Sequence, residues 1–524
     1  MDFFLRLLRQ VLDYLAIVYG NFFHPTKRGL IPPITNPILL LTATQISQRV
    51  KEGKLKAKQV VEAYFKRIEE INPLTNSVIE IRKEAFEDAI AIDERVDKEL
   101  NQGIIGEDGR SIKDFPLLGV PFTCKDSVSI EGMHLVSGLP ERKNIIALED
   151  APVIVNLRNS GAIPMALCNV PELLMWWDAH NPVFGRTNNP YDLSRIPGGS
   201  GGGDAATLAS AASVVSVGSD IGGSVRIPAF HCGIFAHKTS AGVISSKGKY
   251  PPMLPEKESL FAFGPITRYA SDLIPMLKAM AGDGIAKLSK IDEPVDISKL
   301  RVFYMEGDNN PMTTPLSPDM RDSLKSVVNH LEEQYKIKCT KISFDKFNYT
   351  LSMFKASLAE SGSVPLTIEM TNRKYALNPF WELIKWVFGF SAHSLAVIMV
   401  AIVEKTTPPL ETPIVQGNLA VRELLKKEFK EKIGDDGILL YPTFPEPATK
   451  HGTTLLKFSN VNYTSIFNVL GVPSTACPMG LNSEGLPLGL QVVANPYNDH
   501  YTIAVAHEIE KTFGGWVPPC TVAC

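Results

Sequence analysis

The sequence predicts an α/β protein, in which helices alternate with short buried strands. Three observations indicate this class. Apolar residues recur at helical spacing in several segments, short apolar runs between them are bounded by Gly and Pro, and 44% of the 524 residues are hydrophobic. Neither an internal repeat nor a long Ser/Gly linker divides the chain. We therefore expect one large domain over residues 41–524, with residues 300–405 forming a helical cap.

Individual segments support this order of elements. The stretch "KQVVEAYFKRIEEINP", residues 58–73, is a helix that we expect to end at Asn72-Pro73. The runs in "FPLLGVPFTCKDSVSIEG" are typical of buried strands, and "APVIVNLRNSGAIPMALCNVPE" predicts a helix, a glycine turn and a strand. Small residues dominate 205–217, as in a helix packed tightly on a sheet.

The N-terminal residues 1–30 form an amphipathic, apolar segment. Its apolar residues fall at helical spacing, namely Phe3, Phe4, Leu7, Leu8, Val11, Leu12 and Leu15. The charge-free part, 14–23, is too short to cross a bilayer, so we expect a helix lying on a membrane surface. Packing of this helix on the protein's own body is the alternative.

A second apolar segment runs from Trp381 to Lys405. Its charge-free part is long enough to span a membrane, but Gly389, Ser391, His393 and Ser394 interrupt it. This pattern predicts two short helices joined by a turn. They form either a buried hairpin or an exposed cap for membrane docking and substrate entry.

Composition excludes several classes of function. The net charge is −3 and no basic stripe is present, which argues against nucleic-acid binding. The seven scattered cysteines include no C-x-x-C pair and indicate free thiols in an intracellular, reducing compartment. No histidine spacing is typical of a metal site, and we expect neither a metal nor a cofactor.

Two glycine-serine turns lie close together in the chain. The first glycine-serine turn is "SRIPGGSGGGDAATLAS", residues 194–210, and the second is "VGSDIGGSVRIPAF", residues 217–230. Neither turn has the lysine that a P-loop needs to bind phosphate. The second turn lacks the last glycine of the G-x-S-x-G elbow of α/β-hydrolases. A flexible linker is also disfavoured, because linkers lie in polar sequence and these turns do not. Acyl transfer fits better, because a nucleophilic serine needs backbone N–H donors around the developing oxyanion.

The second turn has the residues for such a site. Ser224 follows Ile221, Gly222 and Gly223, whose amides are able to converge, while Asp220 and Arg226 could pair to fix the turn. A serine nucleophile also needs a base. His231 and His237 are near in sequence, and Lys125 at the end of an apolar strand is the other candidate, because burial lowers the pKa of a lysine.

"GVPFTCKDSV", "PGGSGGG" and "VGSDIGGSVRIPAF", in that order, resemble the motifs of the amidase signature family. The resemblance covers roughly Leu41 to the C-terminus. It implies a large mixed β-sheet enclosed by helices and a Ser-Ser-Lys triad. Ser224 matches the nucleophile, Lys125 the base and Ser200 the bridging serine, which the family holds with a cis peptide. By analogy Ile221, Gly222, Gly223 and Ser224 supply the oxyanion amides.

One position departs from the family pattern. The family reads G-G-S-S-G-G, whereas Gly201 stands where the second serine belongs, followed at a distance by Asp204. Loss of one supporting hydrogen bond costs about 1 kcal/mol, which predicts slower catalysis. On this basis we expect Gly201→Ser to preserve or raise activity.

The resemblance and the apolar segments together predict a membrane-associated hydrolase that cleaves fatty-acid amides to a fatty acid and an amine. Its expected partners are a fatty-acid amide, a membrane surface and, as a possibility, a second copy in a homodimer. An amidase of small soluble amides is one alternative. A non-enzymatic lipid-binding descendant of an amidase is another.

Overall fold

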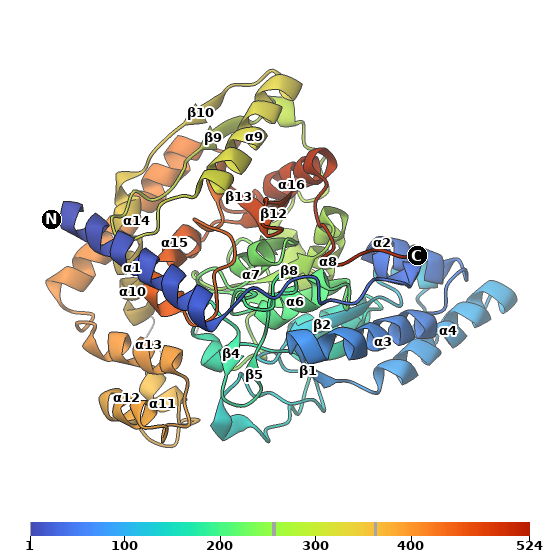
Figure 1. The fold of residues 1–524 in the computed structure, drawn as a ribbon. Coiled ribbons are helices and arrows are strands. Elements are labelled where there is room, and N and C mark those ends of the chain that lie inside the picture. The colour runs from blue at the N-terminus through green and yellow to red at the C-terminus, as the bar shows by residue number, and fades with distance from the viewer. Residues whose placement is uncertain (1, 254–257, 361–363) are drawn as a thin grey trace.

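The computed structural model describes residues 2–253, 258–360 and 364–524. Within these ranges one mixed sheet of eleven strands crosses the molecule (Figure 1). Its strands are β1 (Val78–Ile81), β2 (Pro121–Lys125), β3 (Ile163–Cys168), β6 (Val215–Asp220), β7 (Phe235–Lys238), β8 (Ala262–Thr267), β9 (Arg301–Tyr304), β10 (Cys339–Lys341), β11 (Gly437–Pro442), β12 (Ser474–Leu481) and β13 (Pro487–Ala494). The separate pair β4 (His180–Asn181) and β5 (Gly185–Arg186) is antiparallel.

The strand order in the sheet is β1-β3-β2-β6-β8-β7-β12-β13-β11-β9-β10. β2 is parallel to both β3 and β6, and β9 is parallel to both β10 and β11. The strands between these two groups pair antiparallel. The central strands β2, β3, β6, β7 and β8 are buried along their whole length, as helices on both sides require.

Helices enclose the sheet, as the sequence predicts (Figure 1). They are α1 (Asp2–Phe23), α2 (Ala43–Lys51), α3 (Ala57–Thr75), α4 (Ala85–Gln102), α5 (Pro152–Asn159), α6 (Gly202–Ala209), α7 (Arg226–His231), α8 (Leu273–Ala281), α9 (Pro318–Tyr335), α10 (Thr350–Glu360), α11 (Leu366–Glu369), α12 (Pro379–Val387), α13 (Leu395–Thr406), α14 (Pro413–Ile433), α15 (Asn462–Val469) and α16 (Asp499–Phe513). Near the C-terminus Val522 forms a parallel bridge with Ile34, which lies between α1 and α2.

Two predicted boundaries differ from the structure. Helix α3 includes Pro73 and ends at Thr75, where Asn76 adopts a left-handed conformation and its N–H bonds the Asn72 carbonyl. A proline in the last turn removes only one intrahelical donor, so the helix tolerates it. The small-residue run 205–217 holds two elements, the end of α6 and the start of β6, separated by a turn at Ala211 with φ +59°.

The segment 300–405, predicted as a helical cap, divides into two parts. Strands β9 and β10 with helix α9 extend the main sheet at one edge. Helices α11 to α13 project at the lower left of Figure 1. The interrupted apolar segment forms two short helices, α12 and α13, joined by a turn, as predicted.

Helix α1 packs with an inverted polarity. Arg9, Ala16 and Gly20 are its buried residues, whereas Phe3, Phe4 and Phe22 are each more than 70% exposed. On the inner side Arg9 pairs with Asp13 at 2.8 Å, and Asp13 accepts a hydrogen bond from Thr314 at 3.0 Å. Among the described residues, no helix combines the length and the apolarity needed to cross a membrane.

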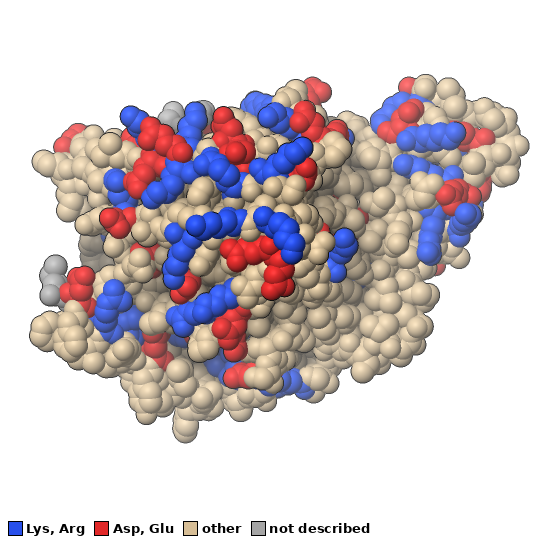
Figure 2. Space-filling model, turned by 90° about the horizontal axis from the view of Figure 1, so that it is seen from above, with Lys and Arg blue, Asp and Glu red and all other residues tan. Residues whose placement is uncertain are grey.

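Charges on the surface are mixed. Figure 2 shows lysines and arginines interspersed with acidic residues over the face seen from above, without an extended area of one sign. All seven cysteines are free thiols.

Candidate active site

The two glycine-serine turns and Lys125 meet at the edge of the sheet that is formed by the carboxyl ends of β2 and β6. β2 ends at Lys125, and its parallel neighbour β6 ends at Asp220, directly before Ile221 and the two glycines of the second glycine-serine turn. Because the carboxyl ends of parallel neighbours lie at the same edge, the sheet brings Lys125 beside this turn. The first glycine-serine turn leads into α6, and the Gly201 N–H donates to the Ser224 carbonyl at 3.1 Å, which joins the two turns.

Lys125 is fully buried, and its Nζ has four oxygen neighbours. It donates to Ser200 Oγ at 3.1 Å and to the Ser219 carbonyl at 2.7 Å, with Ser219 Oγ at 3.4 Å and the Ser224 carbonyl at 3.3 Å. Burial lowers the pKa of Lys125 to about 8, although the charges of Asp204 and Asp220 oppose the shift. About a tenth of this amine is therefore neutral at pH 7, far more than for a lysine with its ordinary pKa, and a base must be neutral to accept a proton.

Ser200 is held in a tightly packed turn. The Gly199-Ser200 peptide bond is cis, and the Ser200 side chain is buried. A Cβ at Gly199 would stand 2.8 Å from the Asp178 nitrogen, so only glycine permits this approach of two backbone segments. The turn therefore sets the Ser200 hydroxyl against Lys125.

The second glycine-serine turn is built around Asp220. Its carboxylate accepts hydrogen bonds from the Gly223 N–H at 2.7 Å and the Val225 N–H at 3.1 Å, and pairs with Arg226 at 3.1 Å. Burial raises the pKa of Asp220, but the charge and hydrogen bonds of Arg226, the charge of Lys238 and the hydrogen bond from Asn468 together outweigh burial and hold that pKa well below its usual range. Asp220 is thus a carboxylate that holds the turn in place.

This geometry corrects one expectation. Gly223 was expected to supply an oxyanion amide, but its N–H donates to Asp220 instead. Gly223 has φ +126°, and a Cβ there would stand 2.1 Å from Thr464 Oγ1. Its role in the structure is close packing of the turn on α15. Ile221, Gly222 and Ser224 stay as the predicted oxyanion donors.

Neither candidate histidine contacts the serines. His237 bonds Thr475 at 2.8 Å and Asp499 at 3.0 Å, in the core between β7 and α16. His231 packs edge-on against Phe444, and neither ring nitrogen has a hydrogen-bond partner among the described residues. Burial lowers the pKa of His231 to about 3. The hydrogen bonds of the site therefore favour Lys125 as the base.

Other residues of the site lie outside the predicted set. Ser219 contacts Lys125 and was available from the motif "VGSDIGGSVR" that the sequence already singles out. The Thr464 hydroxyl donates to the Gly222 carbonyl at 2.7 Å, and Asn468 donates to Asp220 at 2.9 Å. Both come from α15, more than 240 residues later, and no local pattern indicates them.

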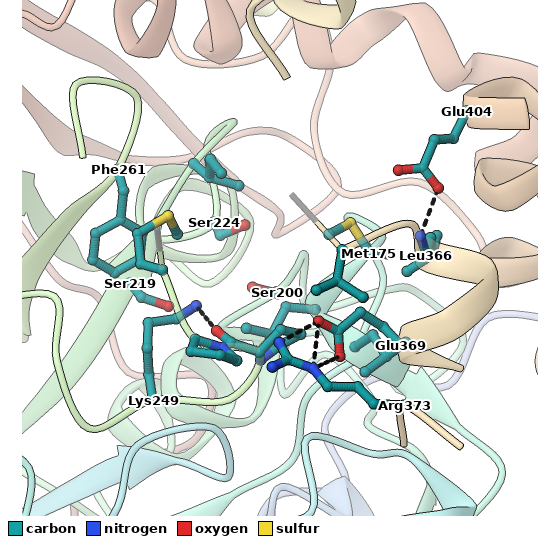
Figure 3. A pocket seen from close by; sticks show the side chains of 17 residues that line it. Met175, Ser200, Ser219, Ser224, Lys249, Phe261, Leu366, Glu369, Arg373 and Glu404 are labelled. Carbon is teal, nitrogen blue, oxygen red and sulfur yellow. Dashed lines mark hydrogen bonds and ion pairs between the residues drawn. The ribbon is translucent and has the colours of Figure 1, made fainter. Parts of the chain in front are cut away.

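A pocket opens at this edge of the sheet and holds about 910 Å³ of empty space, its mouth included. Ser200, Ser219 and Ser224 line it together (Figure 3). Most of the remaining wall is apolar, with Leu173, Leu174, Met175, Ile221, Met253, Phe261, Val364 and Leu366. Arg373 and Glu369 form an ion pair in the wall, and Lys249 Nζ donates to the Pro251 carbonyl.

Comparison with known proteins places this chain in a family. The amidase family model matches residues 59–503, and the chain belongs to the amidase family. It is 41% identical to human fatty-acid amide hydrolase 2 over 96% of this chain and 94% of that protein. It is 40% identical to fatty-acid amide hydrolase 2-A of Danio rerio, over 98% and 97%.

Solved structures share the fold. A crystal structure of an amidase superposes with a TM-score of 0.71 at 24% identity and covers 90% of this chain and all of that one. A fatty acid amide hydrolase structure superposes with a TM-score of 0.68 at 22% identity, over 92% and 86%. The predicted mixed sheet enclosed by helices, the amidase signature fold, is confirmed.

Proposed function

We propose that this protein is a serine hydrolase that cleaves fatty-acid amides to a free fatty acid and an amine. The observation that carries the proposal is the hydrogen bond between Lys125 Nζ and Ser200 Oγ, in a pocket that Ser224 also lines. The apolar wall of this pocket suits an acyl chain. The relatives named fatty-acid amide hydrolase 2, about 40% identical over nearly the whole chain, support this substrate class.

In the proposed mechanism Ser224 is the nucleophile, Ser200 the relay and Lys125 the base. Neutral Lys125 takes the proton of Ser200 as Ser200 takes that of Ser224, whose oxygen bonds the amide carbonyl carbon. The amides of Ile221, Gly222 and Ser224 stabilise the oxyanion. The proton returns through Ser200 to the leaving nitrogen as the C–N bond breaks. Water, activated along the same path, then hydrolyses the acyl-enzyme.

A fluorophosphonate probe tests this assignment, because it labels activated serines. We expect labelling of the wild-type protein and none of Ser224→Ala. Lys125→Ala and Ser200→Ala should label more slowly by about 10²-fold or more, since each breaks the proton path. Labelling that survives Ser224→Ala would refute the nucleophile. Absence of labelling in the wild type would favour the non-enzymatic lipid-binding alternative.

The substrate class needs a separate assay. We expect hydrolysis of a long-chain amide such as an oleoyl amide to exceed that of an acetyl amide in kcat/KM. The apolar pocket wall should contribute roughly 0.8 kcal/mol for each buried methylene, or about fourfold per methylene until the pocket is filled. A preference for the acetyl amide would favour the alternative of small soluble substrates.

We also propose that α1 and the α12–α13 hairpin dock on a membrane surface, with the catalytic domain in a reducing compartment. Around this hairpin Val387, Phe388 and Phe390 are each at least 65% exposed, as are Phe3, Phe4 and Phe22 of α1. Such apolar clusters are rare on a protein that meets only water. Co-sedimentation with phosphatidylcholine vesicles tests this. Phe388→Asp with Phe390→Asp should weaken binding, whereas Leu148→Asp, an exposed apolar site elsewhere, should not.

Two outcomes would contradict the membrane proposal. One is equal binding of the phenylalanine variant and the wild type to vesicles. The other is a dimer in sedimentation velocity that the phenylalanine variant abolishes, which would assign the apolar surface to a homodimer.

A further inference from the structure

Asp204 has a buried carboxylate oxygen without a hydrogen-bond partner. It lies in the first turn of α6, four residues after Ser200, and its side chain is fully buried. The Ser216 hydroxyl donates to Oδ1 at 2.6 Å. Oδ2 has no hydrogen-bond partner among the described residues. A buried polar atom left in this state is costly, so its retention needs a reason.

The unpartnered oxygen faces the place where Lys125 packs against Gly201. A Cβ built on Gly201 would stand 2.9 Å from Lys125 Cε and 3.4 Å from Asp204 Oδ2. One point in space is therefore in contact with both side chains. Because residue 201 is glycine, it places no side chain of its own at this point between the carboxylate and the lysine.

Of the two acids whose charges act on the pKa of Lys125, Asp204 is the one that no arginine neutralises. The other nearby acid, Asp220, pairs with Arg226 and accepts two backbone hydrogen bonds. Burial raises the pKa of Asp204 to about 6, and the charge of Lys125 is the first effect that opposes this shift. Conversely, Asp204 is the first effect that opposes the lowering of the Lys125 pKa. Each group is thus the largest charge effect on the pKa of the other.

We propose that Asp204 is a positioning residue for Lys125. Its unpartnered oxygen, Oδ2, supplies the counter-charge for the protonated amine of Lys125 across the gap left by Gly201. This inference rests on the proposed Ser-Ser-Lys mechanism. When Lys125 takes the proton of Ser200, a positive charge forms on a fully buried amine. Asp204 stabilises that charge without exchanging a proton itself, and so makes Lys125 a stronger base.

The pH dependence of Asp204→Asn separates this role from a structural one. Without the counter-charge the Lys125 pKa falls further, so the acid limb of kcat/KM should move about one pH unit lower. A weaker base should also lower the plateau of kcat. An acid in the first turn of a helix can instead serve only the helix. That role would lower the melting temperature and leave the acid limb in place, which would overturn the proposal.

Asp126→Asn is the matched control. Asp126 is equally buried and follows Lys125 in the chain, but both its oxygens accept backbone N–H groups, from Val136 at 2.8 Å and Gly138 at 3.1 Å. The acid limb of kcat/KM in Asp126→Asn should stay at the wild-type pH. Asp204→Ser also removes the charge and adds no volume. It replaces Asp204→Asn in the pH experiment if thermal unfolding shows that Asp204→Asn is not folded.

The fluorophosphonate labelling rate, measured across the same pH range, separates the two proposals. If the wild type is labelled and the acid limb of both Asp204 variants stays at the wild-type pH, the role of Asp204 is refuted while the mechanism stands. Labelling that survives Ser224→Ala refutes the mechanism on which the inference rests.

Discussion

Lys125 Nζ donates a hydrogen bond to Ser200 Oγ at 3.1 Å, although 75 residues separate the two in the chain. The contact joins the end of β2 to the turn that precedes α6. When the amine is neutral it is able to accept from the same hydroxyl, so this single contact serves both directions of proton transfer. Its protonation state should therefore govern the activity of the proposed enzyme.

We expect kcat/KM to rise with pH with a midpoint near 8. Burial lowers the pKa of Lys125 to about 8, and only the neutral amine accepts a proton, so activity is low below this pKa and full above it. Hydrolysis of an oleoyl amide measured from pH 6 to 10 checks this. A profile that is flat, or that falls across this range, would contradict the assignment of Lys125 as the base.

Gly201→Ser should lower kcat by about tenfold, since crowding a packed site costs roughly 1–3 kcal/mol. The sequence alone predicts the reverse, because the family carries a serine there. In this structure the new Cβ would stand 2.9 Å from Lys125 Cε and 3.0 Å from the Ser224 carbonyl, so the base must shift. Gly201→Ala is the control for the hydroxyl. Wild-type kcat in Gly201→Ser would support the sequence expectation instead.

Arg226→Met should destabilise the protein by about 3–5 kcal/mol, because it leaves the carboxylate of Asp220 buried without its cation. Arg226 and Asp220 are both fully buried. Urea unfolding followed by fluorescence measures the loss. The control is Lys278→Met, which breaks an exposed pair with Asp292 and should cost less than about 1 kcal/mol. Equal losses in the two variants would show that the buried pair is dispensable.

His393 should make stability depend on pH. It bonds Glu172 at 2.6 Å, with Glu141 at 4.0 Å and Glu382 acting on it by charge. Burial lowers the pKa of His393, but the hydrogen bond and charge of Glu172 outweigh burial, and the net shift is upward. The stabilisation is therefore complete below the ordinary pKa of histidine, about 6.5, and is lost as pH rises through the raised value.

Thermal unfolding of wild type and His393→Gln at several pH values checks this. The difference in melting temperature should be largest near pH 6 and smallest at pH 9. Glu172 precedes Leu173 and Leu174 of the pocket wall, so the same pair ties the α12–α13 turn to the pocket. A difference that does not change with pH would mean that the pair is held in its neutral form.

The elements that the sequence predicts well are those with one dominant signal. β2 is a buried run, apolar apart from Thr123, that ends in a charge, and both the strand and the position of Lys125 at its end follow from that pattern. Residues 205–217 were predicted less well. Every residue of α6 and β6 is buried, so neither a helical nor a strand period is visible in the pattern.

The site shows the same division. The motifs placed Lys125, Ser200 and Ser224 near one another, but they could not reveal where each backbone N–H points. Only the fold directs the Gly223 amide to Asp220 and brings Thr464 and Asn468 beneath the turn. Likewise, the family pattern marks Gly201 as a lost hydroxyl, whereas the structure shows that Lys125 packs against the space that the serine would need.

The inverted packing of α1 separates attachment from chemistry. This helix meets the rest of the protein through charged and small residues, Arg9, Ala16 and Gly20, and none of its residues lines the pocket. Its outward phenylalanines are therefore free to vary with the surface they meet, at no cost to the catalytic groups. In the membrane docking that we propose, changes in this one helix would alter the surface on which the protein resides, while the edge of the sheet that holds Lys125 keeps its geometry.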